Sequence, residues 1–273
     1  EWEKQADQSY FYRFYNQHAY YDKGKFNPDQ KEPKPLNIPG QETLAQNFPK
    51  KLSEQKITVL EVQNLVTRFP VYGGILRRRI ANVHAVENVS FSLKKGETMA
   101  LVGESGCGKS SCGRSILRLV EPESGKIFLN KKNILALDSQ DLRMARREMQ
   151  MVFQDPFASL NPYMRLQDQI AEPLKNFGLA SKSEMEDIIR DIMKKVELPL
   201  TFLKRFPHEL SGGQRQRVAI ARAIVVNPSL VIADEAVSAL DVSVQAQVLN
   251  LMMALQDELG LSYLFISHDM AVV

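Results

Sequence analysis

The stretch 103–110 constrains the fold of this chain more than any other feature. It reads GESGCGKS and satisfies the pattern G-x-x-x-x-G-K-[ST] at every position. Glycines let the backbone curl so that successive N–H groups point into one anion-binding cavity, and a following helix presents its positive end to the same anion. The apolar run 98–102 precedes the loop and a helical pattern, 111–120, follows it. This strand–loop–helix order predicts a nucleotide-phosphate site in an α/β domain with buried parallel strands.

The residue types in the loop indicate which chemistry it supports. Lys109 is predicted to reach the β- and γ-phosphates of ATP, and the Ser110 hydroxyl is predicted to ligate Mg²⁺. Cys107 has two open interpretations, either a small filler or a thiol made reactive by the helix N-terminus. The predicted ATP-binding residues of the loop are Gly103, Glu104, Ser105, Gly106, Cys107, Gly108, Lys109, Ser110 and Ser111.

Two carboxylates follow a second apolar run at 230–233. Asp234 is predicted to hold the Mg²⁺ shell and Glu235 to polarise the attacking water, as in other phosphate-loop ATPases. General-base help of this kind raises a rate by about 10²–10⁴-fold. An acidic pair after a strand is weak evidence alone, and its value comes from lying 125 residues after Lys109 (234 minus 109).

A second anion site precedes another helical pattern. The sequence after Leu210 is Ser211, Gly212, Gly213 and Gln214, which places a hydroxyl and two glycines at a helix N-terminus. A single nucleotide does not need two such sites. The economical explanation is that this one serves ATP held by the loop of another domain, so that two domains sandwich the nucleotide.

With the phosphate loop, the acidic strand end and this motif together, the chain from about residue 57 to its last residue resembles the ABC ATPase family. The resemblance implies a phosphate-loop (RecA-like) nucleotide-binding domain with an antiparallel β portion and a helical subdomain at about 146–210. It also implies a role for four further sites. Phe69 would stack on adenine (a plain core Phe is the alternative), Gln154 would touch Mg²⁺ and sense a membrane partner, the loop 238–241 would signal across the dimer, and His268 would contact the γ-phosphate. Lys109, Glu235 and His268 are the predicted catalytic residues, and Ser110, Gln154 and Asp234 are the predicted metal ligands.

Local features at 68–70, 103–110, 154–162 and 206–210 resemble the importer branch for oligopeptides, dipeptides and nickel. Within it the likeness is greatest to the C-terminal half of glutathione importer ATP-binding proteins, which carry two ABC domains in tandem. The resemblance implies an ATPase that powers import of peptide-like substrates. Its implied partners are a second ABC domain (in the same or another polypeptide), transmembrane permease subunits and, indirectly, a periplasmic substrate-binding protein. Its implied place is the cytoplasmic face of the bacterial inner membrane.

Composition separates this prediction from its alternatives. The 35 Lys and Arg nearly cancel the 32 Asp and Glu, and the net charge of +3 is too mild to indicate a nucleic-acid partner. A soluble ABC ATPase acting on nucleic acid or translation remains the alternative, although no long heptad run or CxxC pair supports it. No window holds 18 apolar residues, and two cysteines make no disulfide framework.

The first 56 residues differ from the rest. Aromatic residues are concentrated before position 27, and a proline-bearing run, 27–51, reads as a linker. We expect the aromatic part to pack against this domain or a neighbour. We expect an ABC domain at 57–273 that lacks the family's C-terminal part, within a longer polypeptide. Period-two alternation at 59–62 and 85–93 predicts antiparallel strands. Arg77, Arg78 and Arg79 are predicted to lie in a solvated hairpin loop between them, with a contact to an anion as the alternative. Helical patterns at 183–196, 214–226 and 244–259 complete the α/β reading.

Overall fold

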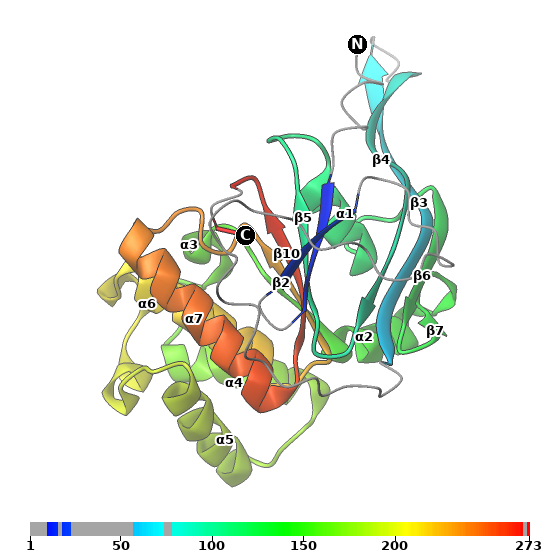
Figure 1. The fold of residues 1–273 in the computed structure, drawn as a ribbon. Helices are drawn as coiled ribbons and strands as arrows, with labels where there is room; N and C mark the ends of the chain where they lie inside the picture. Colours follow the sequence, from blue (N-terminus) through cyan, green and yellow to red (C-terminus); the bar gives the residue numbers. More distant parts are fainter. Residues whose placement is uncertain (1–9, 16–17, 23–56, 74–77, 270–271) are drawn as a thin grey trace.

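The computed structural model describes residues 10–15, 18–22, 57–73, 78–269 and 272–273. Its larger sheet has the strand order β2-β1-β5-β10-β9-β8 (Figure 1). Strands β5, β10, β9 and β8 run parallel to one another, whereas β1 lies antiparallel to both β5 and β2. The bounds of these strands are β1 (Tyr10–Tyr15), β2 (His18–Asp22), β5 (Thr98–Val102), β8 (Met149–Val152), β9 (Leu230–Asp234) and β10 (Ser262–Ser267).

The parallel strands are apolar on both sides because both faces of the sheet are covered. In β5, Met99 and Leu101 belong to the apolar cluster on one face, and Ala100 and Val102 belong to the cluster on the other. The same alternation continues in β9 and β10. Alternate side chains of each strand therefore enter different apolar clusters, and this is why the strands appear in the sequence as continuous hydrophobic runs.

A second, antiparallel sheet has the order β4-β3-β6-β7. Its strands are β3 (Thr58–Gly73), β4 (Arg78–Lys94), β6 (Ser124–Leu129) and β7 (Lys132–Asn133). Strands β3 and β4 form a long hairpin that extends beyond the body of the molecule (Figure 1). The predicted strands at 59–62 and 85–93 are confirmed, but both are longer than expected. Arg78, predicted in the loop, is the first residue of β4 and pairs with Gly73, while residues 74–77 lie outside the described part of the chain.

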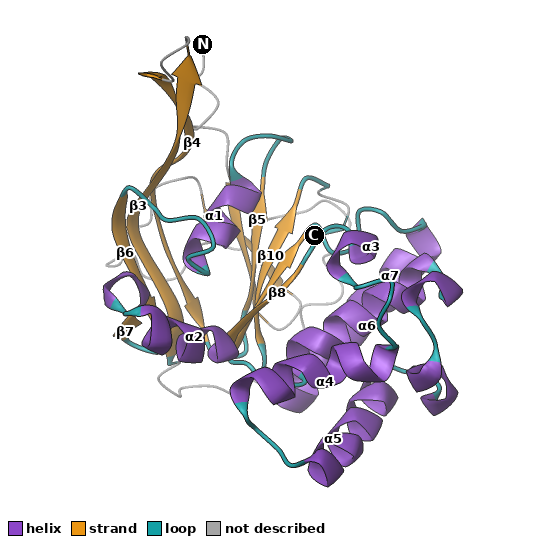
Figure 2. Cartoon of the chain, turned by 180° about the vertical axis from the view of Figure 1, so that it is seen from behind, coloured by secondary structure: helices purple, strands orange, loops and turns teal. Residues whose placement is uncertain are grey.

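The helices are arranged on both sides of the larger sheet (Figure 2). Helix α1 lies between the two sheets, and its buried Cys112 and Ile116 join a core with residues of both. Helices α6 and α7 cover the opposite face, and α4 and α5 pack beyond them. The bounds are α1 (Lys109–Ile116), α2 (Ser139–Glu148), α3 (Pro156–Ser159), α4 (Leu166–Phe177), α5 (Lys182–Lys195), α6 (Gly212–Ile224) and α7 (Val242–Leu259), with 3-10 turns η3 (Ile134–Ala136), η4 (Leu200–Lys204) and η5 (Pro207–Glu209).

Local sequence explains several helix ends. Ser181 caps α5 and Ser211 caps α6 in reciprocal capping boxes with Glu184 and Gln214. The predicted helix at 111–120 is wrong at its C-terminal end, because α1 stops at Ile116. Arg118 adopts a left-handed backbone conformation (φ 52°), which ends the helical path.

The aromatic N-terminal segment joins the larger sheet through its backbone. Strand β1 pairs with β5 in the register from Tyr10↔Val102 to Phe14↔Thr98. The proline-bearing run at 27–51 lies outside the described residues. Within the described part of the chain, no helix has the length and apolar character to cross a membrane. The predicted α/β fold, with parallel strands, an antiparallel sheet and a helical portion, is confirmed; the division at residue 57 and the helical subdomain at about 146–210 remain predictions.

Candidate functional site

The loop 103–110 leaves the end of β5 and leads directly into α1. Gly108 is the N-cap residue of α1 and has φ 95°, a conformation that glycine adopts without the Cβ penalty. A Cβ built on Gly108 would lie 1.7 Å from the Ala85 carbonyl oxygen of β4. The loop therefore packs directly against the backbone of the antiparallel sheet, and this close approach requires glycine.

Lys109 is folded into the loop. Its side chain is almost fully buried, and its Nζ donates hydrogen bonds to the carbonyl oxygens of Gly103 (2.8 Å) and Glu104 (2.7 Å). The same Nζ lies 3.6 Å from Cys107 Sγ. The two carbonyl oxygens accept hydrogen bonds from the Lys109 ammonium but carry no charge that would neutralise it. The ammonium therefore keeps its attraction for an anion in the loop.

Ser110 and Asp234 bring two oxygen ligands together from distant parts of the chain. Ser110 Oγ at the start of α1 donates to Asp234 Oδ1 at the end of β9, at 2.7 Å. Asp234 is 1% exposed, and desolvation is the main reason why its pKa is raised, although the Ser110 hydrogen bond, Arg114 and Lys109 act in the opposite direction. A hydroxyl and one carboxylate are hard oxygen donors, the set that suits Mg²⁺ shared with phosphate oxygens. These residues therefore fit the predicted metal.

Glu235 is the centre of a second group of side chains. Its Oε2 accepts a hydrogen bond from Gln154 Nε2 (2.8 Å) and lies 3.0 Å from His268 Nδ1. Gln154 follows β8, Glu235 follows β9 and His268 follows β10, so adjacent parallel strands present all three at one edge of the sheet. Glu235 has φ 48°, a left-handed conformation that costs a non-glycine residue about 1–2 kcal/mol. Strain of this kind is typical of functional sites.

Most of these residues border one cavity of about 600 Å³. That volume is within the range of small-molecule sites, about 300–1,000 Å³. Of the predicted site residues, those that line it are Phe69, Ser105, Gly106, Cys107, Gly108, Lys109, Ser110, Ser111, Gln154 and Glu235. Gly103, Glu104, Asp234 and His268 do not line it but contact residues that do. The structure therefore brings the phosphate loop, the acidic strand end and the aromatic Phe69 to one place.

The hairpin β3–β4 supplies cavity residues that the sequence did not indicate, namely Val71, Ala81, Asn82, Val83, His84 and Ala85. His84 Nδ1 lies 2.6 Å from Glu87 Oε1, and Arg68 holds the same carboxylate with hydrogen bonds of 2.7 and 2.9 Å. The hydrogen bond from Arg68 is the main reason why the pKa of Glu87 is lowered. The pairing of β3 with β4 places Val83 opposite Phe69, and only this pairing could have indicated that the hairpin residues line the cavity.

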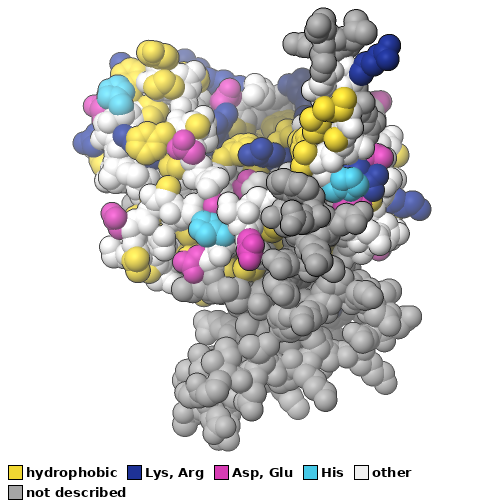
Figure 3. Space-filling model, turned by 90° about the horizontal axis from the view of Figure 1, so that it is seen from above, with side chains coloured by type: hydrophobic (Ala, Val, Ile, Leu, Met, Phe, Trp, Pro, Cys, Tyr) yellow, Lys and Arg dark blue, Asp and Glu magenta, His cyan; other side chains and the backbone are white. Residues whose placement is uncertain are grey.

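Several exposed apolar side chains lie on this hairpin. Tyr72, Ile80 and Val83 are each about half exposed or more. Val83 lines the cavity. Seen from above, hydrophobic side chains gather at one end of this face of the molecule (Figure 3). An apolar wall next to the phosphate loop is suited to the base end of a nucleotide.

The second predicted anion site does not border the cavity. Ser211 Oγ accepts from Gln214 N at 3.3 Å and caps α6. A Cβ on Gly213 would lie 2.4 Å from Val244 Cγ1, so the first turn of α6 packs closely on α7. Among the described residues around the cavity, none comes from 211–214. The structure therefore separates the two predicted anion sites within one chain.

The parallel sheet, the phosphate loop and the cavity at the strand ends define a nucleotide-binding domain of the phosphate-loop class. A family model described as "ABC transporter" matches residues 86–238, more than half of the chain. The chain belongs to the ABC transporter family.

Similar proteins include the oligopeptide transport ATP-binding protein AppF of Bacillus subtilis, 51% identical over 217 residues, which are 79% of this chain and 66% of that protein. The glutathione import ATP-binding protein GsiA of Pectobacterium atrosepticum is 54% identical over 215 residues, which are 79% of this chain and 34% of GsiA. The chain thus spans about two thirds of one relative and about a third of the other.

Solved structures show the same fold. The ATP-binding cassette MJ0796, in a dimeric post-hydrolysis state bound to ADP and Pi, has a TM-score of 0.68 and 30% identity, and the match covers 78% of this chain and 89% of that one. CbiO1 from Clostridium perfringens, part of an ABC transporter complex, has a TM-score of 0.67 and 25% identity, covering 80% and 81%.

Proposed function

We propose that this chain binds and hydrolyses ATP as the nucleotide-binding part of an ABC importer for peptides or peptide-like substrates such as glutathione. The observation that carries the proposal is the convergence on Glu235. Its carboxylate lies beside the phosphate loop and is held by Gln154 and His268. A positioned carboxylate next to a phosphate site is the arrangement that general-base hydrolysis requires.

Each group at the cavity has a defined task in this proposal. The loop amides and Lys109 hold the phosphates, and Phe69 stacks on the base. Ser110 and Asp234, with Gln154, hold Mg²⁺, which neutralises charge on the phosphate oxygens when it is bound. Glu235 orients water and takes its proton, while His268 fixes the position of that carboxylate.

A second ABC domain completes the site. Residues 211–214 do not reach the cavity of their own chain, so we assign them to the nucleotide of a partner domain. A related cassette is dimeric in a structure that holds ADP and Pi. Two copies arranged head to tail, or two domains of one polypeptide, each provide the loop for one nucleotide and the Ser211 helix end for the other.

Replacing Glu235 with Gln tests the catalytic assignment. We expect ATP to bind to the full-length E235Q protein while its steady-state hydrolysis falls by about 10²-fold or more, because the general base is lost. The matched control is Glu121→Gln, which makes the same change at an exposed carboxylate paired with Arg118. Hydrolysis by E235Q at the wild-type rate would exclude Glu235 as the base.

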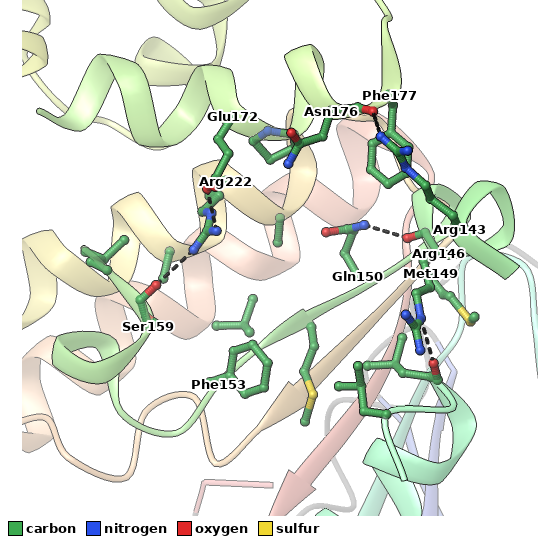
Figure 4. A pocket seen from close by; sticks show the side chains of 18 residues that line it. Arg143, Arg146, Met149, Gln150, Phe153, Ser159, Glu172, Asn176, Phe177 and Arg222 are labelled. Carbon is green, nitrogen blue, oxygen red and sulfur yellow. Dashed lines mark hydrogen bonds and ion pairs between the residues drawn. The ribbon is translucent and has the colours of Figure 1, made fainter. Parts of the chain in front are cut away.

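A separate cavity supports docking of a permease subunit. It has a volume of about 570 Å³ and lies between α2 and β8 on one side and α3, α4 and α6 on the other (Figure 4). Phe153 and Phe177 line it together with Arg143, Arg146 and Arg222. Phe153 borders this cavity and the next residue, Gln154, borders the nucleotide cavity. A partner seated here is therefore one residue away from the nucleotide site.

Transport and hydrolysis measured together test the importer assignment. In the full-length protein with its permease, at the cytoplasmic face of the inner membrane, we expect Phe153→Ala to lower peptide uptake relative to ATP hydrolysis. Leu200→Ala is the control, because Leu200 is equally exposed (41% against 40%) but lies outside this cavity. Equal uptake by both variants would contradict the docking assignment, and ATPase activity stimulated by nucleic acid would favour a soluble ABC ATPase instead.

A further inference from the structure

Arg215 is a buried cation at the start of α6. It follows Gln214 directly, and the residue is 8% exposed. Its Nε donates to the Pro207 carbonyl oxygen at 2.6 Å, and its Nη2 lies 3.4 Å from the His208 carbonyl oxygen. Its Cζ lies 3.8 Å from the centre of the Phe157 ring. The guanidinium is thus held between two backbone carbonyls and one aromatic face.

These contacts are unlike ordinary packing. Among the described residues no carboxylate forms an ion pair with Arg215, so its burial has no counter-ion to offset the lost hydration. An apolar side chain of similar volume could fill the space at a smaller cost in desolvation. Only a planar cation can donate to the carbonyls and stack on the ring at the same time. The residue type therefore points to a linking role.

The segments that Arg215 links belong to both predicted nucleotide contacts. Phe157 lies three residues after Gln154, in the short helix α3, whose N-cap Asp155 accepts from Phe157 N at 2.7 Å. Pro207 lies four residues before Ser211, in the turn η5 that leads to the α6 cap. One side chain therefore joins the loop that borders the chain's own nucleotide cavity to the loop assigned to a partner's nucleotide.

A second arginine on the same helix reinforces this junction. Arg222 lies seven residues after Arg215, two helical turns along the same face. It donates to the Ser159 carbonyl oxygen at 2.9 Å and pairs with Glu172 at 2.7 Å (Figure 4). Helix α3 is thus attached to α6 near both of its ends, so movement of one is transmitted to the other.

We propose that Arg215 is a positioning residue that couples the segment after Gln154 to the loop 211–214. The inference rests on the proposed function, because it takes Gln154 and Ser211 as contacts of two different ATP molecules. With the link intact, displacement of the Gln154 segment re-orients the Ser211 helix end toward the partner domain. Without it, each segment keeps its own fold but the two no longer move together.

The test compares Arg215→Gln with Arg217→Gln in the full-length protein. Arg217 is on the same helix but donates to Val196 (3.0 Å) and Glu197 (2.7 Å), away from both loops. We expect Arg215→Gln to lower kcat by about tenfold or more, since misplacement by 1 Å can cost about 10²-fold. We expect its Kd for a fluorescent ATP analogue to stay within about twofold of wild type, because it leaves the phosphate loop untouched. Arg217→Gln should keep the wild-type kcat even though it lowers thermal stability about as much as Arg215→Gln does. Equal losses of kcat in the two variants would overturn the proposal.

A double-mutant cycle on kcat that pairs Arg215→Gln with a change at Phe157 gives a second readout of the link. Phe157→Leu removes the stacking partner, and because the residue is 62% exposed, little core is disturbed. Coupled residues give losses that do not add, whereas additive losses would contradict the link. Arg215→Lys should recover part of the activity, because it keeps the charge but not the planar fork. Lack of ATP hydrolysis by the wild-type protein would refute the proposed function; normal hydrolysis by Arg215→Gln would refute this inference alone.

Discussion

Replacing Gly108 with Ala is the sharpest test of how the phosphate loop is built. The added Cβ would lie 1.7 Å from the Ala85 carbonyl oxygen and 2.8 Å from its carbon, whereas real Cβ contacts stay above 3.0 Å. The obstacle is backbone of β4 rather than the end of a flexible side chain. The loop or the strand must therefore move by more than about 1 Å, the scale on which catalytic geometry is lost.

Two free-energy terms add in this variant. The left-handed backbone at φ 95° costs alanine about 1–2 kcal/mol, and displacement of the loop adds to that cost. Gly96→Ala isolates the cost of the left-handed backbone. Gly96 lies in the turn before β5 with φ 69°, and a Cβ built on it meets no atom within 4 Å. At about 2–4 °C per kcal/mol for a domain of this size, Gly96→Ala should lower Tm by about 2–8 °C and Gly108→Ala by more.

Thermal unfolding and titration with a fluorescent ATP analogue separate the two terms. We expect Gly96→Ala to bind ATP like the wild type, and Gly108→Ala to lose about 10²-fold in affinity because its amides no longer converge on the phosphates. Wild-type ATP affinity in Gly108→Ala would refute the claim that the packing of this loop on Ala85 sets the phosphate site.

Three further predictions follow from individual side chains. Burial raises the pKa of Asp234, so the folded chain binds the carboxyl proton more tightly than the unfolded chain does, and the protein loses stability as pH rises through the raised pKa. Asp234→Asn should therefore raise Tm at neutral pH without nucleotide, and this gain should shrink on acidification. Calorimetry that shows no gain in Tm at pH 7 would contradict the prediction. Burial raises the pKa of Cys112 to about 12, so iodoacetamide should modify the partly exposed Cys107 in the native protein and Cys112 only after unfolding, as mass spectrometry would show. Phe69→Ala should weaken ATP binding by about 5–100-fold if the ring stacks on the base, whereas Tyr72→Ala, on the same strand but outside the cavity, should not; equal effects would remove Phe69 from the site.

The parts of the site that lie close together in sequence could be predicted. The phosphate loop, the strand before it and the Asp234–Glu235 pair are local patterns, in which strand, turn and chemistry follow from neighbouring residues. Gln154 and His268 are isolated polar residues after strands, and only the resemblance to a family indicated them. Their contact with one oxygen of Glu235 depends on the order β10-β9-β8, which strand patterns alone do not determine.

The contribution of the long hairpin to the cavity could not be predicted for the same reason. His84 has no motif around it, and it reaches the cavity because β3 and β4 pair over a length set by long-range register, including several irregularities. The separation of residues 211–214 from the cavity also depends on tertiary structure. The sequence predicts a second nucleotide for that motif because two anion sites exceed what one nucleotide needs, and this assignment stays a prediction.

The pairing of β1 with β5 has a practical consequence for anyone who expresses part of this chain. The strand that carries the phosphate loop has β10 on one side and β1 on the other, five residue pairs long. The family model begins at residue 86, so a fragment chosen from that match, or one beginning at Ile57, would omit β1. β5 would then be an edge strand with a row of unpaired N–H and C=O groups, a template for association between copies. Low solubility of such a fragment would reflect its boundary, not a defect of the nucleotide site.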